Sequence, residues 1–287
     1  MISIFQAVII GLIQGLTELF PISSLGHSVI VPQLFGWNIH QNDSYFLTFL
    51  VATHLATALV LLFFFGREWL KILKGLGRSL ANKYIDPKDT YAKLGWLLVI
   101  GTIPAGILGL LFEQSLRGFF ASAHYAAGFL ILNGFILLAA EKLRKRRENK
   151  PESEGQSDAN IAKLSWRHAV GIGTIQSAAL FPGISRSGSS MAGGLLAGLN
   201  NEDAARFSFL LATPVIGAAA VLKLPSLFTS SMAPMRTAII VGALCSAVTA
   251  YISVRFLVKY FQTKTLTPFA IYCLLAGISF SVYFLVK

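Results

Sequence analysis

Charged residues are scarce in this chain: they make up 13% of its 287 residues, whereas hydrophobic residues make up 54%. Long stretches such as 46–65 and 239–254 are apolar on nearly every helical face. A soluble domain of this size has no core large enough to bury such stretches. The composition therefore excludes a soluble globular protein and predicts a polytopic helical membrane protein.

Cysteine is nearly absent, and the common motifs of soluble enzymes are missing. The two cysteines, Cys245 and Cys273, both lie in apolar stretches, without the paired loop spacing of a disulfide framework or zinc site. The chain has no Walker-type phosphate loop, no His-Glu-x-x-His motif and no dinucleotide-binding fingerprint. The first 20 residues lack the basic stretch and cleavage site of a signal peptide, so we expect no cleaved leader.

Acidic residues are outnumbered by basic ones, which gives a formal net charge of +11. A nucleic-acid partner is not needed to explain this charge, because the Lys and Arg residues lie in loops beside apolar stretches. Orientation by the positive-inside rule and contact with anionic lipids account for their distribution. We therefore expect a membrane partner and no nucleic acid.

Two similar polar segments interrupt the apolar pattern, and the first occupies residues 11–27, with the sequence GLIQGLTELFPISSLGH. It begins as an apolar helix on which Gln14 and Glu18 share one face, four residues apart. Pro21 ends that helix, since its ring and missing N–H cannot continue the turn. Directly beyond the break lie the polar or flexible residues Ser23, Ser24, Gly26 and His27.

The second segment, residues 173–190, repeats this plan as GTIQSAALFPGISRSGSS. Gln14 and Gln176 lie 162 residues apart, and Gly26 and Gly188 have the same separation. Arg186 takes the place of Ser24 in this alignment, and Ser189 takes that of His27. Two broken helices, one carrying a carboxylate and an imidazole and the other a guanidinium, predict one composite site.

The duplication and the apolar stretches together define a fold. We predict an all-α polytopic membrane protein with an inverted-topology repeat, six transmembrane helices and two re-entrant helix pairs. The first repeat covers 1–140, with a re-entrant pair at 4–37 and spans at 44–65, 94–112 and 122–140. A charged linker covers 141–167. The second repeat covers 168–287, with a re-entrant pair at 168–200 and spans at 204–222, 237–258 and 267–286.

The basic loops fix the expected orientation in the membrane. Residues 67–93 and 141–167 are rich in Lys and Arg and are separated by two spans, so both are expected on the cytoplasmic side. Residues 223–236 carry little charge and are expected outside, as are both termini. In inverted repeats the two broken-helix tips meet near the midplane, where a substrate site is expected.

Arg186 is the residue whose presence most needs an explanation, because a buried Arg in a membrane is costly. Its planar fork binds a phosphate through two parallel hydrogen bonds. A helix beginning near Gly188 points its positive end at the same place. Hydroxyl donors and flexible backbone surround it: Ser185, Ser187, Ser189, Gly183 and Gly188. The competing interpretation is a purely structural ion pair between Arg186 and Glu18.

Several roles remain open for the first tip. Glu18 is a candidate ligand for a divalent cation or a proton acceptor. His27 is a candidate acid, base or nucleophile, Ser24 a candidate nucleophile, and direct attack by water a third route. Among residues elsewhere, His54 is interpreted as a hydrogen bond within the bundle and Arg206 as snorkelling to the interface. Glu113 and Glu141 are interpreted as interfacial.

On these motifs the chain resembles the undecaprenyl-diphosphate phosphatases, membrane enzymes associated with bacitracin resistance. The resemblance covers essentially the whole chain and includes 11–27, 100–104, 181–188 and 205–211 with Pro214. It implies hydrolysis of a polyprenyl diphosphate lipid to the monophosphate on the outer face of the bacterial plasma membrane, which recycles the lipid carrier for cell-wall synthesis. It also implies a divalent cation (Mg or Ca), a homodimer, and important positions at Gln14, Glu18, Ser24, His27, Ser185 and Arg186.

Two departures from the family pattern concern the first tip. Many members have Glu where this chain has Gln14, and Ser or Thr where it has Leu25. The combined expectation is catalysis by Glu18, Ser24, His27 and Arg186, with Glu18 as the metal ligand. Substrate-binding residues are expected to be Gln14, Ser23, Ser185, Ser187 and Gly188. The alternative function is a transporter or flippase for polyprenyl phosphate lipids, since inverted repeats also build transporters.

Overall fold

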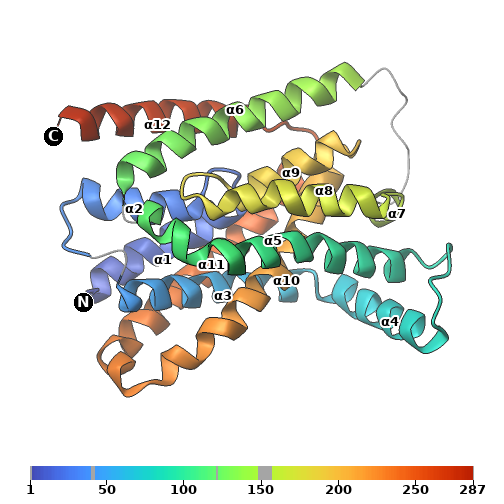
Figure 1. Ribbon diagram of the computed structural model, residues 1–287, viewed down its shortest axis with the longest axis horizontal. Helices are drawn as coiled ribbons and strands as arrows, with labels where there is room; N and C mark the ends of the chain where they lie inside the picture. The colour runs from blue at the N-terminus through green and yellow to red at the C-terminus, as the bar shows by residue number, and fades with distance from the viewer. Residues whose placement is uncertain (1, 40–42, 121, 148–156, 287) are drawn as a thin grey trace.

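The computed structural model describes residues 2–39, 43–120, 122–147 and 157–286, and within these ranges every regular element is helical (Figure 1). Six helices are long and apolar enough to cross a membrane in the described part of the chain. They are α3 (Ser44–Phe64), α5 (Thr90–Phe120), α6 (Ala123–Arg147), α10 (Asn201–Lys223), α11 (Arg236–Tyr260) and α12 (Thr267–Val286). The prediction of an all-α protein with six spanning helices is thus confirmed.

Two pairs of short helices correspond to the two polar segments. The first pair is α1 (Ile4–Leu19) and α2 (Ser24–Leu34), and the second is α8 (Trp166–Gln176) and α9 (Arg186–Leu196). An 11-residue helix such as α2, α8 or α9 is about 16 Å long, too short for a hydrocarbon layer of roughly 30 Å. Their re-entrant position in a membrane and the inverted repeat stay predictions.

Glycine allows the two breaks to touch each other. A Cβ atom added to Gly26 would lie 2.9 Å from the Cα atom of Gly183, closer than side chains allow. Gly183 also has a φ of 109° and passes close to the carbonyl oxygen of Ala126 on α6, 2.3 Å from where a Cβ would stand. A close backbone approach at Gly26, and a close approach together with a positive φ at Gly183, are both compatible only with glycine. This explains why each tip contains one.

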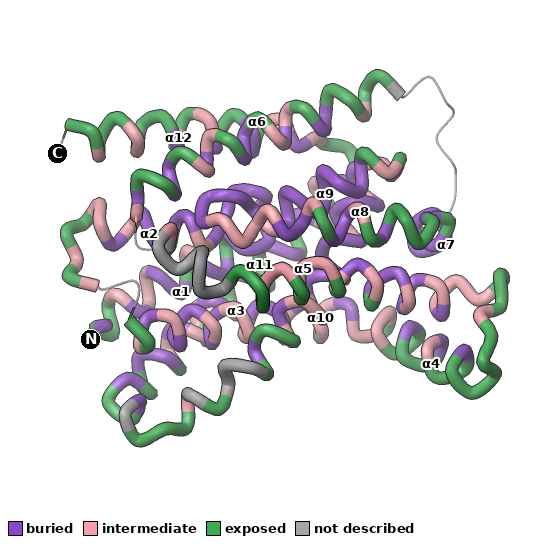
Figure 2. Tube along the Cα trace, viewed as in Figure 1, coloured by how far each residue is buried: buried purple, intermediate pink, exposed green. Residues whose placement is uncertain are grey.

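Small residues also bring α1 against α11. Added Cβ atoms at Gly11 and Gly15 would lie 2.3 Å and 2.1 Å from the carbonyl oxygens of Gly242 and Ser246. Close approach through small residues is a common way for helices to pack in membranes, where lipid removes the hydrophobic driving force. Figure 2 shows that α2 and α9 are largely buried, whereas α8 is partly exposed and α12 and much of α6 are exposed.

The remaining elements lie mainly at the two ends of the bundle. Both termini lie at one end, and the turn between α4 (Gly66–Asn82) and α5 lies at the other, near α7 (Ser157–Ala162) (Figure 1). Three short 3₁₀ helices complete the fold: η1 (Ser177–Leu180), η2 (Leu224–Phe228) and η3 (Ser230–Met235). The basic segment 67–93, expected as a loop, contains the helix α4, and the linker 141–167 is helical at both its described ends.

Two charged residues have specific partners that the sequence did not indicate, while the snorkelling of Arg206 and the interfacial position of Glu141 stay predictions. The guanidinium of Arg206 donates to Asp158 at 2.7 Å and to Glu68 at 3.2 Å. Glu141 is buried, and it accepts from Arg144 at 2.8 Å and from the backbone N–H of Leu266 at 3.2 Å. Both carboxylate–guanidinium contacts fasten helix ends, which hydropathy alone does not show. Glu113 lies among residues whose side chains are not described.

Candidate active site

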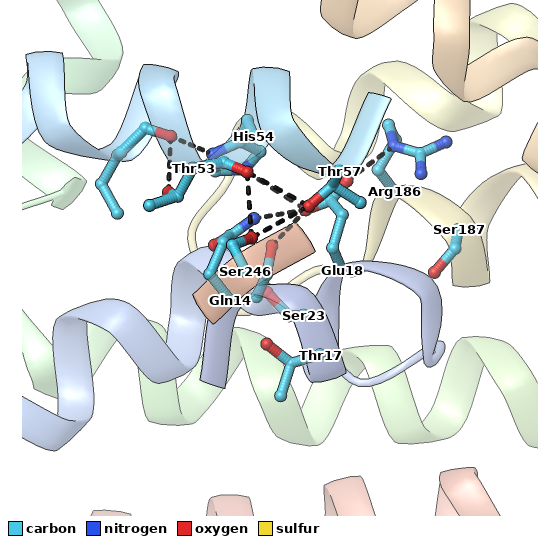
Figure 3. A network of polar contacts seen from close by, with 12 residues as sticks. Gln14, Thr17, Glu18, Ser23, Thr53, His54, Thr57, Arg186, Ser187 and Ser246 are labelled. Atoms are coloured by element: carbon cyan, nitrogen blue, oxygen red, sulfur yellow. Dashed lines mark hydrogen bonds and ion pairs between the residues drawn. The ribbon is translucent and has the colours of Figure 1, made fainter. Parts of the chain in front are cut away.

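Glu18 is the centre of a polar cluster buried among the apolar helices (Figure 3). It lies one residue before the end of α1, where Pro21 prevents further helix. Its Oε2 atom accepts from the hydroxyl of Ser24 at 2.5 Å and from the amide of Gln14 at 3.1 Å. Its Oε1 atom accepts from Nε of Arg186 at 3.1 Å. The structure therefore joins residues that are 168 positions apart in the sequence.

Ser24 owes its position to an unusual backbone at the first tip. The preceding residue, Ser23, has a φ of 69°, a left-handed conformation that is rare for residues other than glycine. The Ser23 hydroxyl caps α2 by accepting from the N–H of Gly26 and also accepts from the N–H of Gly183, both at 3.2 Å. These two contacts hold the strained residue in place and direct Ser24 at Glu18.

Arg186 begins α9, directly after the second tip. Ser185 caps this helix by accepting from the N–H of Gly188 at 3.1 Å, and its own N–H donates to Asn133 at 3.0 Å. The guanidinium also donates to the carbonyl of Ser208 through Nη1 at 3.4 Å. Its Nη2 atom is buried and has no partner in the described part of the protein. The guanidinium thus retains donor capacity for a ligand.

Ser187 and Asn133 connect the two tips. The Ser187 hydroxyl donates to the carbonyl of Phe20 at 3.2 Å, which places it between the tips and not in the cavity described below. Asn133, a fully buried residue of α6, donates to the carbonyl of Pro21 at 3.0 Å and accepts from Ser185. Asn133 was not selected from the sequence, since a lone amide in an apolar helix carries no motif.

A cavity of about 460 Å³ opens beside the cluster. Glu18, Ser23, Ser24, Ser185 and Arg186 form its polar end, together with His54, Gln176 and Ser177. The other walls are apolar and come from α5, η1 and α10, and they include Ala105, Gly106, Gly109, Leu110, Leu180, Val215, Ile216, Ala218 and Ala219. Gly106, Leu110, Ala218 and Ala219 are exposed on helices that are candidate membrane spans, so the cavity reaches the lateral surface of the bundle.

His27 does not contact Ser24, with which the sequence suggested a nucleophile–base pair. Its Nδ1 lies 2.7 Å from the carbonyl of Ser23 and its Nε2 lies 2.8 Å from the hydroxyl of Tyr272 on α12. Because a carbonyl only accepts, Nδ1 carries a proton, and in the neutral ring Nε2 accepts from Tyr272. His27 does not line the cavity, and it fastens the first tip to α12. Its catalytic role stays a prediction.

His54 lies in the cluster, although the sequence interpretation gave it only a bundle hydrogen bond. That hydrogen bond exists, from Nδ1 to the carbonyl of Leu50 at 2.7 Å. The other nitrogen, Nε2, lies 3.3 Å from Oε2 of Glu18, and a quarter of the side chain is exposed to the cavity. The sequence did contain a signal for this, because an ionisable residue in the middle of a membrane span is a candidate functional residue.

The oxygen donors at and beside the polar end of the cavity fit a hard cation that would be shared with the phosphates of a substrate. No group of three or more His, Cys, Asp or Glu residues is gathered in the described part of the chain, so a preformed protein cage for a metal is not found there. Glu18 offers a carboxylate, and Oε1 of Gln14 is a buried carbonyl without a hydrogen-bond partner among the described residues. Mg²⁺ is commonly held by one or two carboxylates together with substrate phosphates.

These observations define the class of the molecule. It is a multi-pass helical membrane protein with a carboxylate, a hydroxyl and a guanidinium gathered at one end of an apolar cavity. The family model "Bacitracin resistance protein BacA" matches residues 7–279. The chain therefore belongs to the BacA family.

Curated relatives of the chain carry the name undecaprenyl-diphosphatase. The relative from Mycolicibacterium paratuberculosis is 48% identical over 96% of this chain and 95% of its own length. One from Frankia alni is 43% identical, with 97% of both chains covered, and one from Burkholderia ambifaria is 41% identical, with 99% and 98% covered. The similarity thus extends over both tips and all six spanning helices.

Proposed function

We propose that the protein hydrolyses undecaprenyl diphosphate, or a similar polyprenyl diphosphate, to the lipid monophosphate and inorganic phosphate. Membership of the BacA family and the names of the relatives support this function over lipid transport. The observation that carries the proposal is the Ser24 hydroxyl donating to Glu18 at 2.5 Å, with Arg186 on the same carboxylate. A transporter needs to bind phosphate but has no use for a serine paired with a base.

The contacts favour Ser24 as the nucleophile. In the first step, Oγ of Ser24 bonds to the terminal phosphorus, and its proton moves to Oε2 of Glu18. The bond from phosphorus to the bridging oxygen breaks, and its electron pair leaves on the lipid monophosphate. In the second step, water attacks the phosphorus of the phosphoserine and the bond from phosphorus to Oγ breaks. The proton held by Glu18 returns to Oγ, and inorganic phosphate leaves with the oxygen and hydrogens of the water. Arg186 holds the transferred phosphoryl oxygens through both steps.

The cavity explains how a lipid substrate would be held. The diphosphate occupies the polar end, and the polyprenyl tail follows the apolar walls of α5 and α10 toward the lateral opening at Gly106 and Ala219. Small side chains on both walls leave room for a branched hydrocarbon chain. Burial of the tail supplies binding free energy in proportion to the apolar area covered.

Three further properties belong to the proposal. A divalent cation, Mg²⁺ or Ca²⁺, would be held by Glu18 with diphosphate oxygens and would neutralise charge that develops on the phosphates. The site is expected to face the outside of a bacterial plasma membrane, because the basic segments 67–93 and 141–167 orient the bundle. The homodimer implied by the resemblance is retained, and chemical cross-linking in membranes tests it.

The decisive experiment measures phosphate released from undecaprenyl diphosphate by the purified protein in detergent. Release is expected with Mg²⁺ or Ca²⁺, and loss of release after chelation is expected to be reversed by adding the cation back. A substrate labelled in the terminal phosphate, quenched during turnover, distinguishes the nucleophiles. An acid-stable adduct supports Ser24, an acid-labile one His27, and no adduct supports water. Binding of the lipid without phosphate release would refute the proposed hydrolysis.

A further inference from the structure

Gln176 is an unexplained polar residue in the wall of the cavity. It is the last residue of α8, directly before η1, and it is 2% exposed. Neither its Nε2 nor its Oε1 has a hydrogen-bond partner in the described part of the protein. Its side chain lines the same cavity as Ser24 and Arg186. A buried amide with both atoms unpaired is rare in proteins and calls for a partner.

Comparison with the other half of the chain sharpens this observation. Gln14 occupies the corresponding place before the first tip, and its Nε2 donates to Glu18 at 3.1 Å. Among the described residues no acceptor lies within hydrogen-bond distance of Nε2 of Gln176. Since an unpaired buried amide destabilises the protein, a free Gln176 costs stability that a ligand can restore.

The unpaired atoms near Gln176 indicate the charge of that ligand. Nη2 of Arg186 is also buried and has no hydrogen-bond partner within the described ranges, and Arg186 lines the same cavity from the start of α9. The amide nitrogen of Gln176 and Nη2 of Arg186 together offer hydrogen-bond donors and one positive charge. The complementary ligand has several acceptor oxygens and a negative charge, as a diphosphate has.

The position of α8 indicates which phosphate Gln176 meets. A Cβ atom added to Gly173 would lie 2.2 Å from the carbonyl of Gly101, so α8 packs closely on α5. One turn further along α5 lie Ala105 and Gly106, where the apolar wall begins. Gln176 therefore lies where the polar end of the cavity meets the wall formed by α5, whereas Glu18 and Ser24 come from the other tip.

From this placement we infer that Gln176 binds the phosphate that remains on the lipid, while Arg186 binds the phosphate that is transferred. The inference rests on the proposed function, because it assigns a second phosphate subsite within that same site. Nε2 of Gln176 donates to an oxygen of the lipid-linked phosphate. Loss of this donor weakens binding of a diphosphate and costs the substrate-free protein nothing.

The test replaces the amide with an apolar side chain of similar size, Gln176→Leu, and compares it with the matched variant Gln14→Leu. Removing an unpaired amide should raise the melting temperature of the substrate-free Gln176→Leu protein by about 2 °C or more. Removing the paired amide in Gln14→Leu should lower it. For Gln176→Leu, kcat/KM on undecaprenyl diphosphate should fall by about 10- to 100-fold, the effect of losing a hydrogen bond to a charged group.

A binding measurement separates this inference from the proposed function. Farnesyl diphosphate should raise the melting temperature of the wild type more than that of Gln176→Leu. A Gln176→Leu protein with unchanged kcat/KM, or one that melts below the wild type without ligand, would overturn the inference. If the wild type released no phosphate, the proposed function would be wrong. Equal melting shifts with farnesyl diphosphate in both proteins would then reject Gln176 as a diphosphate-binding residue as well.

Discussion

Replacing Arg186 with Lys keeps the positive charge and removes the planar fork, which makes it a sharp test of the site. In the structure the guanidinium donates to Glu18 through Nε and to the carbonyl of Ser208 through Nη1, and Nη2 has no partner in the part of the chain that is described. Three donors therefore point in three directions from one rigid plane. A Lys ammonium on a flexible stem cannot keep Glu18 in place and bind a phosphate with two parallel hydrogen bonds at once.

The size of the effect follows from what the fork does in the reaction. If Arg186 stabilises charge on the phosphoryl oxygens mainly in the transition state, its loss should cost about 2–4 kcal/mol. That corresponds to a decrease in kcat of roughly 30- to 1000-fold. KM should change less, because the charge that attracts the diphosphate is retained in Arg186→Lys.

The assay is phosphate release from undecaprenyl diphosphate, measured at saturating and at low substrate. Arg236→Lys is the matched control, since Arg236 is exposed at the start of α11 and donates to the backbone carbonyls of Phe228 and Thr229. It should retain wild-type kinetics. Turnover by Arg186→Lys close to that of the wild type would show that a point charge suffices and that the reasoning from fork geometry is wrong.

Three further predictions follow from the same contacts. Ser24→Ala should lower kcat by about 1,000-fold or more if Ser24 is the nucleophile, and residual turnover above one tenth of wild type would exclude it. Glu18→Gln should abolish turnover and also destabilise the protein by about 3–5 kcal/mol, because it leaves the buried guanidinium of Arg186 without its counter-charge. Denaturant unfolding measures that loss, and a Glu18→Gln protein as stable as the wild type would contradict the ion pair. Gly183→Ala should destabilise the protein well beyond Gly36→Ala, since both glycines have positive φ but only Gly183 has backbone at 2.3 Å from an added Cβ. The melting temperatures of the two variants test this prediction. Similar melting temperatures would mean that the close contact of Gly183 with the backbone of α6 does not contribute to stability.

Much of the architecture could be predicted because it follows from local physical chemistry. Each spanning helix contains a long run of apolar residues, so the expected span 44–65 and the observed Ser44–Phe64 agree within one residue. Pro21 and its counterpart Pro182 mark the two breaks, because proline cannot continue a helix. The repetition of one polar pattern after 162 residues indicated that the two breaks belong together, and the contact between Glu18 and Arg186 agrees with that expectation.

The direction in which a side chain points from a break could not be predicted. Ser24 and His27 are three residues apart in α2, and the sequence made them candidates for one pair. The left-handed backbone of Ser23 sets the start of the helix so that Ser24 points at Glu18, while His27 points at Tyr272. Such an orientation depends on the packing of α2 against α6 and α12, which appears in no local pattern.

Residues from distant helices were missed for a related reason. His54 and Asn133 each lie alone in an apolar stretch, and nothing in the neighbouring sequence tells whether such a residue meets lipid, a carbonyl or a carboxylate. Their importance comes from contacts with residues more than 30 positions away: His54 with Glu18, and Asn133 with Pro21 and Ser185. Tertiary contacts of this kind are visible only once the helices are packed.

The two tips solve an electrostatic problem that one tip could not solve. Ser24 and Arg186 are the first residues of α2 and α9, so two helix N-termini are directed at the cavity, each with roughly half a positive charge. In the free protein the carboxylate of Glu18 neutralises the guanidinium of Arg186, which keeps the cost of burying either charge low. A diphosphate supplies several negative charges, and it can draw on both N-termini and on the free Nη2 of Arg186 without removing Glu18 from Ser24. The side-chain charges of Glu18 and Arg186 therefore cancel in the empty site, while the two helix N-termini keep it attractive to an anion, which a single charged residue in a membrane could not achieve.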